Sequence, residues 1–240
     1  MSPTLRGALF SLTAFGLYAT HDVVVKFLGA SYAPFQTIFF STLLSFPLVT
    51  LMLMRDRTDG NLRPRQPVWV AIRTGAAILN VVAAFYAFSV LPLAQAYAIF
   101  FAMPLLITLL AIPILGERVG MRRGLAVAAG LVGVIIVLRP GQAEFGLGQF
   151  SALGAAVTGS LVSIIVRKIG QEERSAVLML YPMVANFLVM AFVLPFVYRP
   201  LPIEHLGLVA LMSGLGFLAG LFIIAAYRTA PAVIVAPMQY

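Results

Sequence analysis

The chain has 240 residues, of which 61% are hydrophobic and only 10% charged, and its mean hydropathy is +1.01. Soluble globular proteins carry about a quarter charged residues, so this composition excludes a water-soluble domain and indicates lipid as the solvent. The net charge of +8 comes from basic residues that are split among short loops, which excludes a nucleic-acid-binding face.

The apolar runs predict eight complete membrane spans and the start of a ninth. We expect them at residues 7–27, 34–54, 68–90, 95–115, 122–138, 149–167, 176–197 and 205–227, with a ninth from about 231. The first run lacks a basic leader and a cleavage site, so we expect it to remain as a span. Continuous helices satisfy their own backbone groups in lipid, and the predicted fold class is an all-α polytopic membrane protein.

The loop charges predict the orientation of these spans. Cytoplasmic loops are enriched in Lys and Arg. With a cytoplasmic N-terminus, 13 of the 16 basic residues fall at inner ends, and the outer ends keep Lys26, Arg139 and Arg199. We therefore expect a multi-pass protein of the cell (inner) membrane, with its N-terminus in the cytoplasm.

Metal and redox chemistry find no support in the composition. The chain has no cysteine, and its two histidines, His21 and His205, are too few and too scattered for a histidine-based metal site. We expect no metal site and no cofactor.

An internal repeat divides the chain into two halves. The sequence AFSVLP at 87–92 aligns with AYRTAP at 226–231, and Lys26 and Gly29 align with Arg167 and Gly170. We predict five-helix repeats at 1–140 and 148–240. Five spans precede the second copy, so it must enter the membrane from the opposite side. Such inverted repeats are a transporter architecture with a site near the membrane midplane, and a non-transporting scaffold stays open as the alternative.

The second repeat is shorter than the first. The ninth span has about ten residues before Tyr240, or ~15 Å at 1.5 Å per residue, against a ~30 Å hydrocarbon core. The partner of Glu117 would fall beyond residue 240. We therefore expect a ten-span plan of which this chain holds about nine spans, with the C-terminus missing.

Several short motifs recur in a fixed order along the chain. They are Pro104-Leu105, Gly116-Glu117-Arg118, Gly124, Gly130 and Gly133, Arg139-Pro140, and AYRTAPAVIVAPMQY at 226–240. Together with the ten-span plan, this order resembles the drug/metabolite transporter superfamily, EamA type. Asp22 and Lys26 are similar to the branch that includes S-adenosylmethionine uptake carriers. The resemblance implies transport of a small organic metabolite.

The Gly116-Glu117-Arg118 motif combines charge with a helix end. Glu117 lies at a predicted helix C-terminus, which is unfavourable for an anion. We expect Arg118, Arg122 and Arg123 to neutralise it in a structural ion pair, with gating as the alternative. The glycines at 124, 130 and 133 are expected to allow close helix packing.

Polar side chains near the outer ends of the spans are candidates for substrate binding or gating. Asp22 and Lys26 are four residues apart on one helix face, with the acid first. A simple interfacial pair, with Lys26 reaching the headgroups, stays open beside a substrate role. The residues that could line an external vestibule are His21, Asp22, Lys26, Gln36, Gln95 and Tyr97.

Deeper candidates lie in the third and seventh spans. Arg73 and Asn80 are seven residues apart, so they share a helix face that suits a cavity wall. Contact between Arg73 and lipid phosphates is an equal alternative, and Tyr181 is open in the same way. Prolines inside the predicted spans can kink helices and free carbonyls. They are Pro47, Pro104, Pro113, Pro182 and Pro195.

These features predict a secondary transporter that moves an amino acid, adenosyl compound or drug-like solute by alternating access. A nucleotide-binding motif is absent from the sequence, which argues against ATP-driven transport by this chain alone. An intramembrane enzyme is the alternative class, although Asp22 is the only acid well inside a span. Coupling to a proton or another ion, and a homodimer, stay open.

Overall fold

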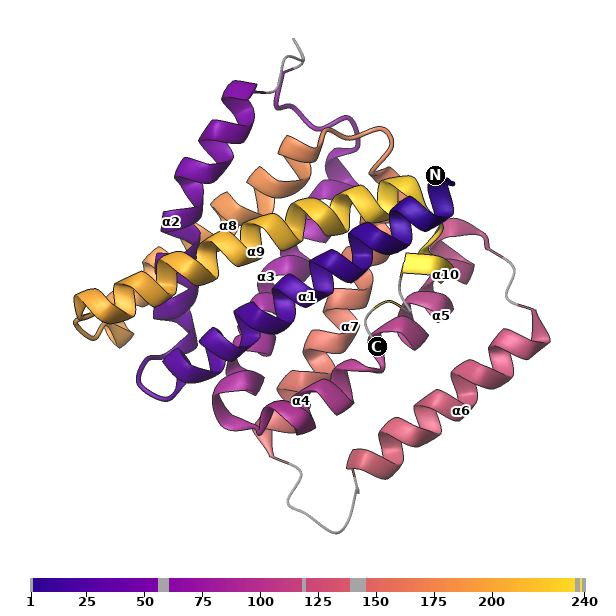
Figure 1. Cartoon of the computed structure of the whole chain (residues 1–240), viewed down its shortest axis with the longest axis horizontal. Coiled ribbons are helices and arrows are strands. Elements are labelled where there is room, and N and C mark those ends of the chain that lie inside the picture. The colour runs from indigo at the N-terminus through magenta and orange to yellow at the C-terminus, as the bar shows by residue number, and fades with distance from the viewer. Residues whose placement is uncertain (1, 56–60, 118–119, 139–145, 236–237, 239–240) are drawn as a thin grey trace.

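The structure is a computed structural model of residues 1–240, and it describes all of them except 1, 56–60, 118–119, 139–145, 236–237 and 239–240. The described residues form helices and short connections (Figure 1). The helices are α1 Pro3–Gly29, α2 Pro34–Arg55, α3 Pro67–Val90, α4 Leu93–Phe100, α5 Met103–Leu115, α6 Met121–Leu138, α7 Leu147–Ile169, α8 Ser175–Val197, α9 Ile203–Thr229 and α10 Ala232–Val235.

The helices confirm the predicted fold class. Within the described residues, seven helical stretches are long and apolar enough to cross a membrane: α1, α2, α3, α4 with α5, α7, α8 and α9. The fifth predicted span is also helical, as α6, and α10 begins where the ninth span was expected. The protein is therefore an all-α, multi-pass membrane protein.

Helices from the two halves of the chain pack against each other. α1 packs along α9, α3 packs along α7, and α2 packs along α8. Figure 1 shows α1 and α9 crossing the molecule together, with α6 at its edge. We call the side where α1 begins the inner end of the bundle and the side where α1 finishes the outer end. The inverted repeat remains a prediction.

Glycine permits one close helix contact near the start of α1 and another near the start of α7. A Cβ atom on Gly7 of α1 would overlap Ala230, and one on Gly148 of α7 would lie 2.8 Å from Cγ2 of Val90 and 2.9 Å from Cδ2 of Leu91. Glycine allows the backbones to approach here because it has no side chain.

The predicted fourth span is interrupted. Residues 95–115 were expected as one helix, but the structure ends α4 at Phe100 and begins α5 at Met103. Pro104 explains the break, because it has no N–H to donate to the Phe100 carbonyl. The Ser160 hydroxyl of α7 donates to the Ala156 carbonyl at 2.6 Å and lies 3.2 Å from the Met103 carbonyl, which places α7 beside the break.

The glycines of α6 differ in their surroundings. A Cβ on Gly130 would come within 2.6 Å of Leu105 Cδ1, so this glycine does pack closely against α5. Gly124 and Gly133 have no described atom within 4 Å of that position. Of these three glycines, the described residues therefore show close packing at Gly130, and the expectation for Gly124 and Gly133 stays a prediction.

Buried apolar side chains gather in two clusters, one toward each end of the bundle. The inner cluster includes Ile107, Ile164, Leu178 and Ile224. The outer cluster includes Val25, Leu28, Ile99 and Met212. The polar side chains described next lie among and between these two clusters.

Candidate functional site

The first helix turns one face inward along its whole length. Its buried residues recur every three or four positions, as expected for one helix face, and Tyr18 is half-buried on the same face. The buried positions are Gly7, Ser11, Ala14, His21, Val24, Val25 and Leu28. The polar groups of the middle and outer part of α1 therefore point into the bundle.

Asp22 is the centre of a polar cluster near the outer end. His21 Nδ1 lies 2.8 Å from Asp22 Oδ1, and the Tyr97 hydroxyl of α4 donates to Asp22 Oδ2 at 2.7 Å. The side chains of His21 and Asp22 are only 11% and 14% exposed. The structure thus joins three of the predicted site residues, and it brings Tyr97 to Asp22 across two helices.

Lys26 does not pair with Asp22 in the described part of the chain. Its ammonium donates to the Leu91 carbonyl at 2.8 Å and to the Ser89 carbonyl at 3.3 Å, both at the end of α3. The last carbonyls of a helix lack intrahelical partners and favour a cation. The end of α3 therefore competes with the Asp22 carboxylate for the Lys26 ammonium. Lys26 therefore caps α3 from α1.

Arg167 makes the corresponding contact at the inner end. Its Nη1 donates to the Tyr227 carbonyl at 3.1 Å, in the last turn of α9. The repeat alignment pairs Arg167 with Lys26, and it pairs the end of α9 with the end of α3. A cap of this kind is therefore present at both ends of the bundle.

Arg73 is buried in the bundle, at 7% exposure. Its Nη1 donates to the Leu178 carbonyl of α8 at 2.5 Å, and its Nε has no hydrogen-bond partner within the described structure. Pro182 lies four residues after Leu178 and cannot donate to it, so the proline frees this carbonyl. The expected effect of an in-span proline is thus found at Pro182, because the Leu178 carbonyl that it frees binds the Arg73 guanidinium.

Tyr18 interacts electrostatically with both of these charged groups. It is four residues before Asp22 on the inward face of α1, and it is within Coulombic range of both Asp22 and Arg73. A Cβ on Gly220 of α9 would lie 3.9 Å from its hydroxyl. Tyr18 was not among the predicted site residues.

Three other predicted residues stand apart from the Asp22 cluster. Asn80 donates to the Ala155 carbonyl of α7 at 2.8 Å, so it joins two helices. Gln95 is half-buried in the first turn of α4, where its backbone N–H donates to Pro92 at 3.0 Å. Tyr181 is 37% exposed on α8. Their roles as site residues stay predictions.

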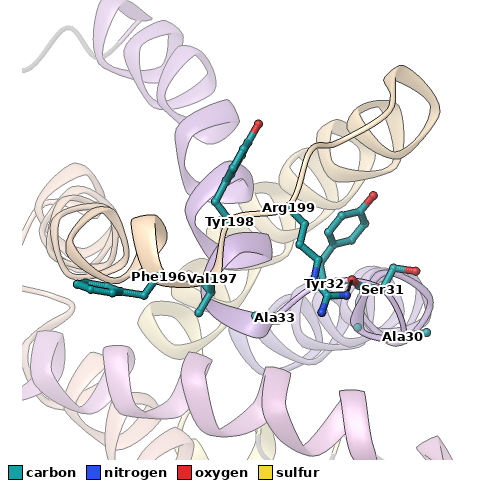
Figure 2. Close-up of a pocket in the computed structure, with 9 residues that line it drawn as sticks. Ala30, Ser31, Tyr32, Ala33, Phe196, Val197, Tyr198 and Arg199 are labelled. Atoms are coloured by element: carbon teal, nitrogen blue, oxygen red, sulfur yellow. Dashed lines mark hydrogen bonds between the residues drawn. The ribbon is translucent and has the colours of Figure 1, made fainter.

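The two halves of the chain meet at the outer end. Gln36 donates through Nε2 to the Arg199 carbonyl at 2.6 Å and accepts from the Arg199 N–H at 2.7 Å. The Tyr32 hydroxyl lies 2.6 Å from His205 Nδ1. Figure 2 shows Tyr32 and Arg199 beside a cavity of about 470 Å³ that residues 29–33 and 196–199 line. We call these contacts the outer closure.

A second closure joins the halves at the inner end. Glu173, which is only 2% exposed, accepts from the Gln66 N–H at 2.6 Å, and Glu172 accepts from the Gln66 side chain. Arg174 donates to the Asn61 carbonyl at 3.3 Å. We call these contacts the inner closure.

In the motif Gly116-Glu117-Arg118, Gly116 ends α5 as its C-cap. Gly116 has φ 71°, which side chains disfavour, and the N–H groups of Gly116 and Glu117 donate back to Ile112 and Ala111. The expected pairing of Glu117 with Arg118, Arg122 or Arg123 lies outside the described residues and side chains. Pro104 is buried at the start of α5.

Glu117 also shares a cavity with basic residues of α7. This cavity measures about 470 Å³ and is lined by Ile114, Leu115, Glu117, Arg167, Lys168 and Gln171. Lys168 donates to the Ile114 carbonyl at 2.7 Å and lies 4.8 Å above the Trp69 ring. The sequence placed these cations at the inner end, but not beside the motif.

Several relatives carry transporter names. The S-adenosylmethionine uptake transporter of Rickettsia prowazekii (strain Madrid E) is 23% identical over 98% of this chain and 80% of its own length. The corresponding protein of Rickettsia bellii (strain RML369-C) is 23% identical, over 92% and 76%. The riboflavin transporter of Vibrio cholerae serotype O1 is 27% identical over 74% of this chain, which covers 60% of that relative.

The family model agrees with these likenesses. The EamA-like transporter family matches residues 5–139, which hold α1 to α6 and the Asp22 cluster, Lys26 and Arg73. This region is more than half of the chain. The family description and the names of the relatives indicate a transporter of small metabolites. This multi-pass membrane protein belongs to the EamA-like transporter family.

Proposed function

We propose that the protein is a secondary transporter that moves a small organic metabolite across the inner membrane by alternating access. The family match and the transporter names of its relatives support the transport of a small metabolite. The loop charges support a cytoplasmic N-terminus. In this proposal the segments 1–140 and 148–240 are inverted repeats, and the exchanged helix pairs and matching caps support that assignment.

The two charged side chains inside the bundle, Asp22 and Arg73, indicate a class of substrate. Asp22 and Arg73 are opposite charges inside the bundle. Asp22 accepts a hydrogen bond from Tyr97, and Arg73 donates one to the Leu178 carbonyl. Ionisable side chains are costly within a membrane and are usually functional there. Tyr18 interacts electrostatically with both of them. A solute with both a cationic and an anionic group, such as an amino acid or an adenosyl compound that contains one, matches this arrangement.

The two closures are the proposed gates. Each joins a segment before residue 140 to a segment after it, and they lie at opposite ends of the bundle. Opening one while the other stays closed would expose the Asp22–Arg73 region to one side at a time.

Transport by the purified protein in proteoliposomes tests the proposal. The solutes are S-adenosylmethionine, a set of amino acids and riboflavin, each offered with and without a pH gradient, since the His21–Asp22 pair makes proton coupling testable. We expect saturable uptake of at least one of them. Absence of uptake for all of these solutes would contradict the proposal.

Two variants test the named residues. We expect Asp22→Asn and Arg73→Gln each to reduce transport at least tenfold, because each removes a charge from the interior. Arg65→Gln, which removes an exposed loop charge, is the matched control and should transport normally. Normal transport by both interior variants would remove Asp22 and Arg73 from the site while leaving the family assignment intact.

A further inference from the structure

A large groove opens between α2, α8 and α9 in the inner half of the bundle. Its volume is about 730 Å³, and its walls include Leu48, Leu51 and Met52 of α2 and Phe217, Leu218 and Leu221 of α9. Leu51 and Leu218 are 47% and 45% exposed. Figure 1 shows α2 and α9 crossing and then diverging toward their inner ends, with α8 between them. The groove is therefore an apolar recess at membrane depth.

The length of the groove matches one leaflet of a bilayer. It reaches along α9 from Gly214 to Arg228. At 1.5 Å per residue this stretch is about 21 Å long, whereas half of a ~30 Å hydrocarbon core is about 15 Å. The groove thus accommodates an acyl chain and reaches the headgroup level at the Arg228 end.

The inner end of the groove is basic. Arg174 and Arg228 both line it. Arg228 donates from Nη1 to the Ser175 hydroxyl at 2.6 Å, and a guanidinium has five N–H donors in all. Ser175 is the first residue of α8, whose amino end adds partial positive charge. This end suits an anionic oxygen ligand.

We propose that this groove binds an anionic phospholipid, with its phosphate at Arg174 and Arg228 and one acyl chain along α2 and α9. A phospholipid combines an apolar tail with a phosphate at the membrane interface, and basic pockets between membrane helices bind anionic headgroups. The two arginines favour an anionic lipid over a zwitterionic one. The side that the loop charges predict to be cytoplasmic is the side on which such lipids are enriched.

Lipid binding to the purified protein in detergent tests the proposal by native mass spectrometry. The probes are phosphatidylglycerol and phosphatidylcholine with the same acyl chains. We expect phosphatidylglycerol to bind more tightly, and each of Arg174→Gln and Arg228→Gln to weaken it about fivefold, with phosphatidylcholine little changed. Arg63→Gln, an exposed charge on the same side and outside the groove, should bind as the unchanged protein does.

A second variant keeps the test independent of the arginine contacts that stabilise the protein. Leu218→Trp fills the groove from an exposed position, so we expect it to fold and to lose phosphatidylglycerol binding. Equal binding of the two lipids, or phosphatidylglycerol binding that survives both the arginine changes and Leu218→Trp, would overturn the proposal. Binding of a transported solute or of a second copy of the chain in the groove, with no lipid bound, would overturn it too. The measurement does not depend on transport.

Discussion

The outer and inner closures join the same two segments of the chain, but they use different chemistry. The outer closure is built mainly from amide, hydroxyl and imidazole groups, at Gln36, Tyr32 and His205, and its one charged contact, from Arg199 Nη1 to the Ser31 carbonyl, is exposed to solvent. The inner closure uses the carboxylates of Glu172 and Glu173. Hydrogen bonds to ionised groups are roughly twice as strong as neutral ones. The inner closure is therefore expected to be the harder one to open in this conformation.

The largest expected effect is at the inner closure. Glu173→Ala removes a buried acceptor of a charged hydrogen bond, which contributes about 1.5–3 kcal/mol. We expect tenfold or greater acceleration of maleimide labelling from the inner side at Met179→Cys, a position near Tyr18. The chain has no cysteine of its own, so the label reports this position alone. Unchanged labelling would show that Glu173 does not hold the inner end closed.

The two helix caps give the next effect. Lys26→Met leaves two carbonyls of α3 without their cation, whereas Arg167→Met removes one contact from α9. Both caps are half-buried, so we expect losses of about 1–2 kcal/mol, and thermal unfolding about 2–8 °C lower, with Lys26→Met the larger. Lys26→Arg, which retains a cation, is the control. A larger loss for Arg167→Met would contradict this comparison.

A smaller effect is expected for Gln36→Ala at the outer closure. This change removes two neutral hydrogen bonds to the Arg199 backbone, each worth about 0.5–1.5 kcal/mol in net terms and so each weaker than the charged hydrogen bond at Glu173. We expect a few-fold faster labelling from the outer side at Ser41→Cys. Gln36→Glu keeps one acceptor, so its labelling rate should lie between those of Gln36→Ala and the unchanged protein. An effect larger than that of Glu173→Ala would reverse the ranking of the closures.

The smallest effect is expected for Tyr32→Phe. It removes one hydroxyl contact with His205 and retains the ring packing of the two side chains at 5.5 Å between centroids. We expect less than a threefold change in outer labelling at Ser41→Cys. Tyr198→Phe, an exposed tyrosine in the same region, serves as the control. A change as large as that of Gln36→Ala would make Tyr32 a principal part of the outer closure.

The sequence predicted the spans well because a membrane helix is encoded by a long apolar run. It missed the break between α4 and α5, although Pro104 was known, since neighbouring contacts decide whether a proline bends or interrupts a helix. The Ser160 contact with Met103 is such a tertiary detail. The four-residue spacing of Asp22 and Lys26 suggested that these two side chains pair. Lys26 instead binds the free carbonyls at the end of α3, which lie within its reach.

The candidate site was predictable where polar residues fell within long apolar runs. Asp22 and Tyr97 stood out in this way, and the structure joins them. Tyr18 was missed because a tyrosine within an apolar run looks like ordinary packing. For Arg73, the choice between cavity and lipid phosphate depended on a carbonyl of α8 that only the fold brings near.

The bond between Arg73 and the Leu178 carbonyl has a consequence for selectivity. In the proposed transport cycle, a solute that binds Arg73 must compete with an acceptor that the protein already supplies. A carboxylate forms a stronger hydrogen bond to a guanidinium than an amide carbonyl does, whereas an uncharged oxygen gains little by the exchange. The resting bond at 2.5 Å thus sets a threshold that discriminates against neutral solutes before any shape-based fit is reached.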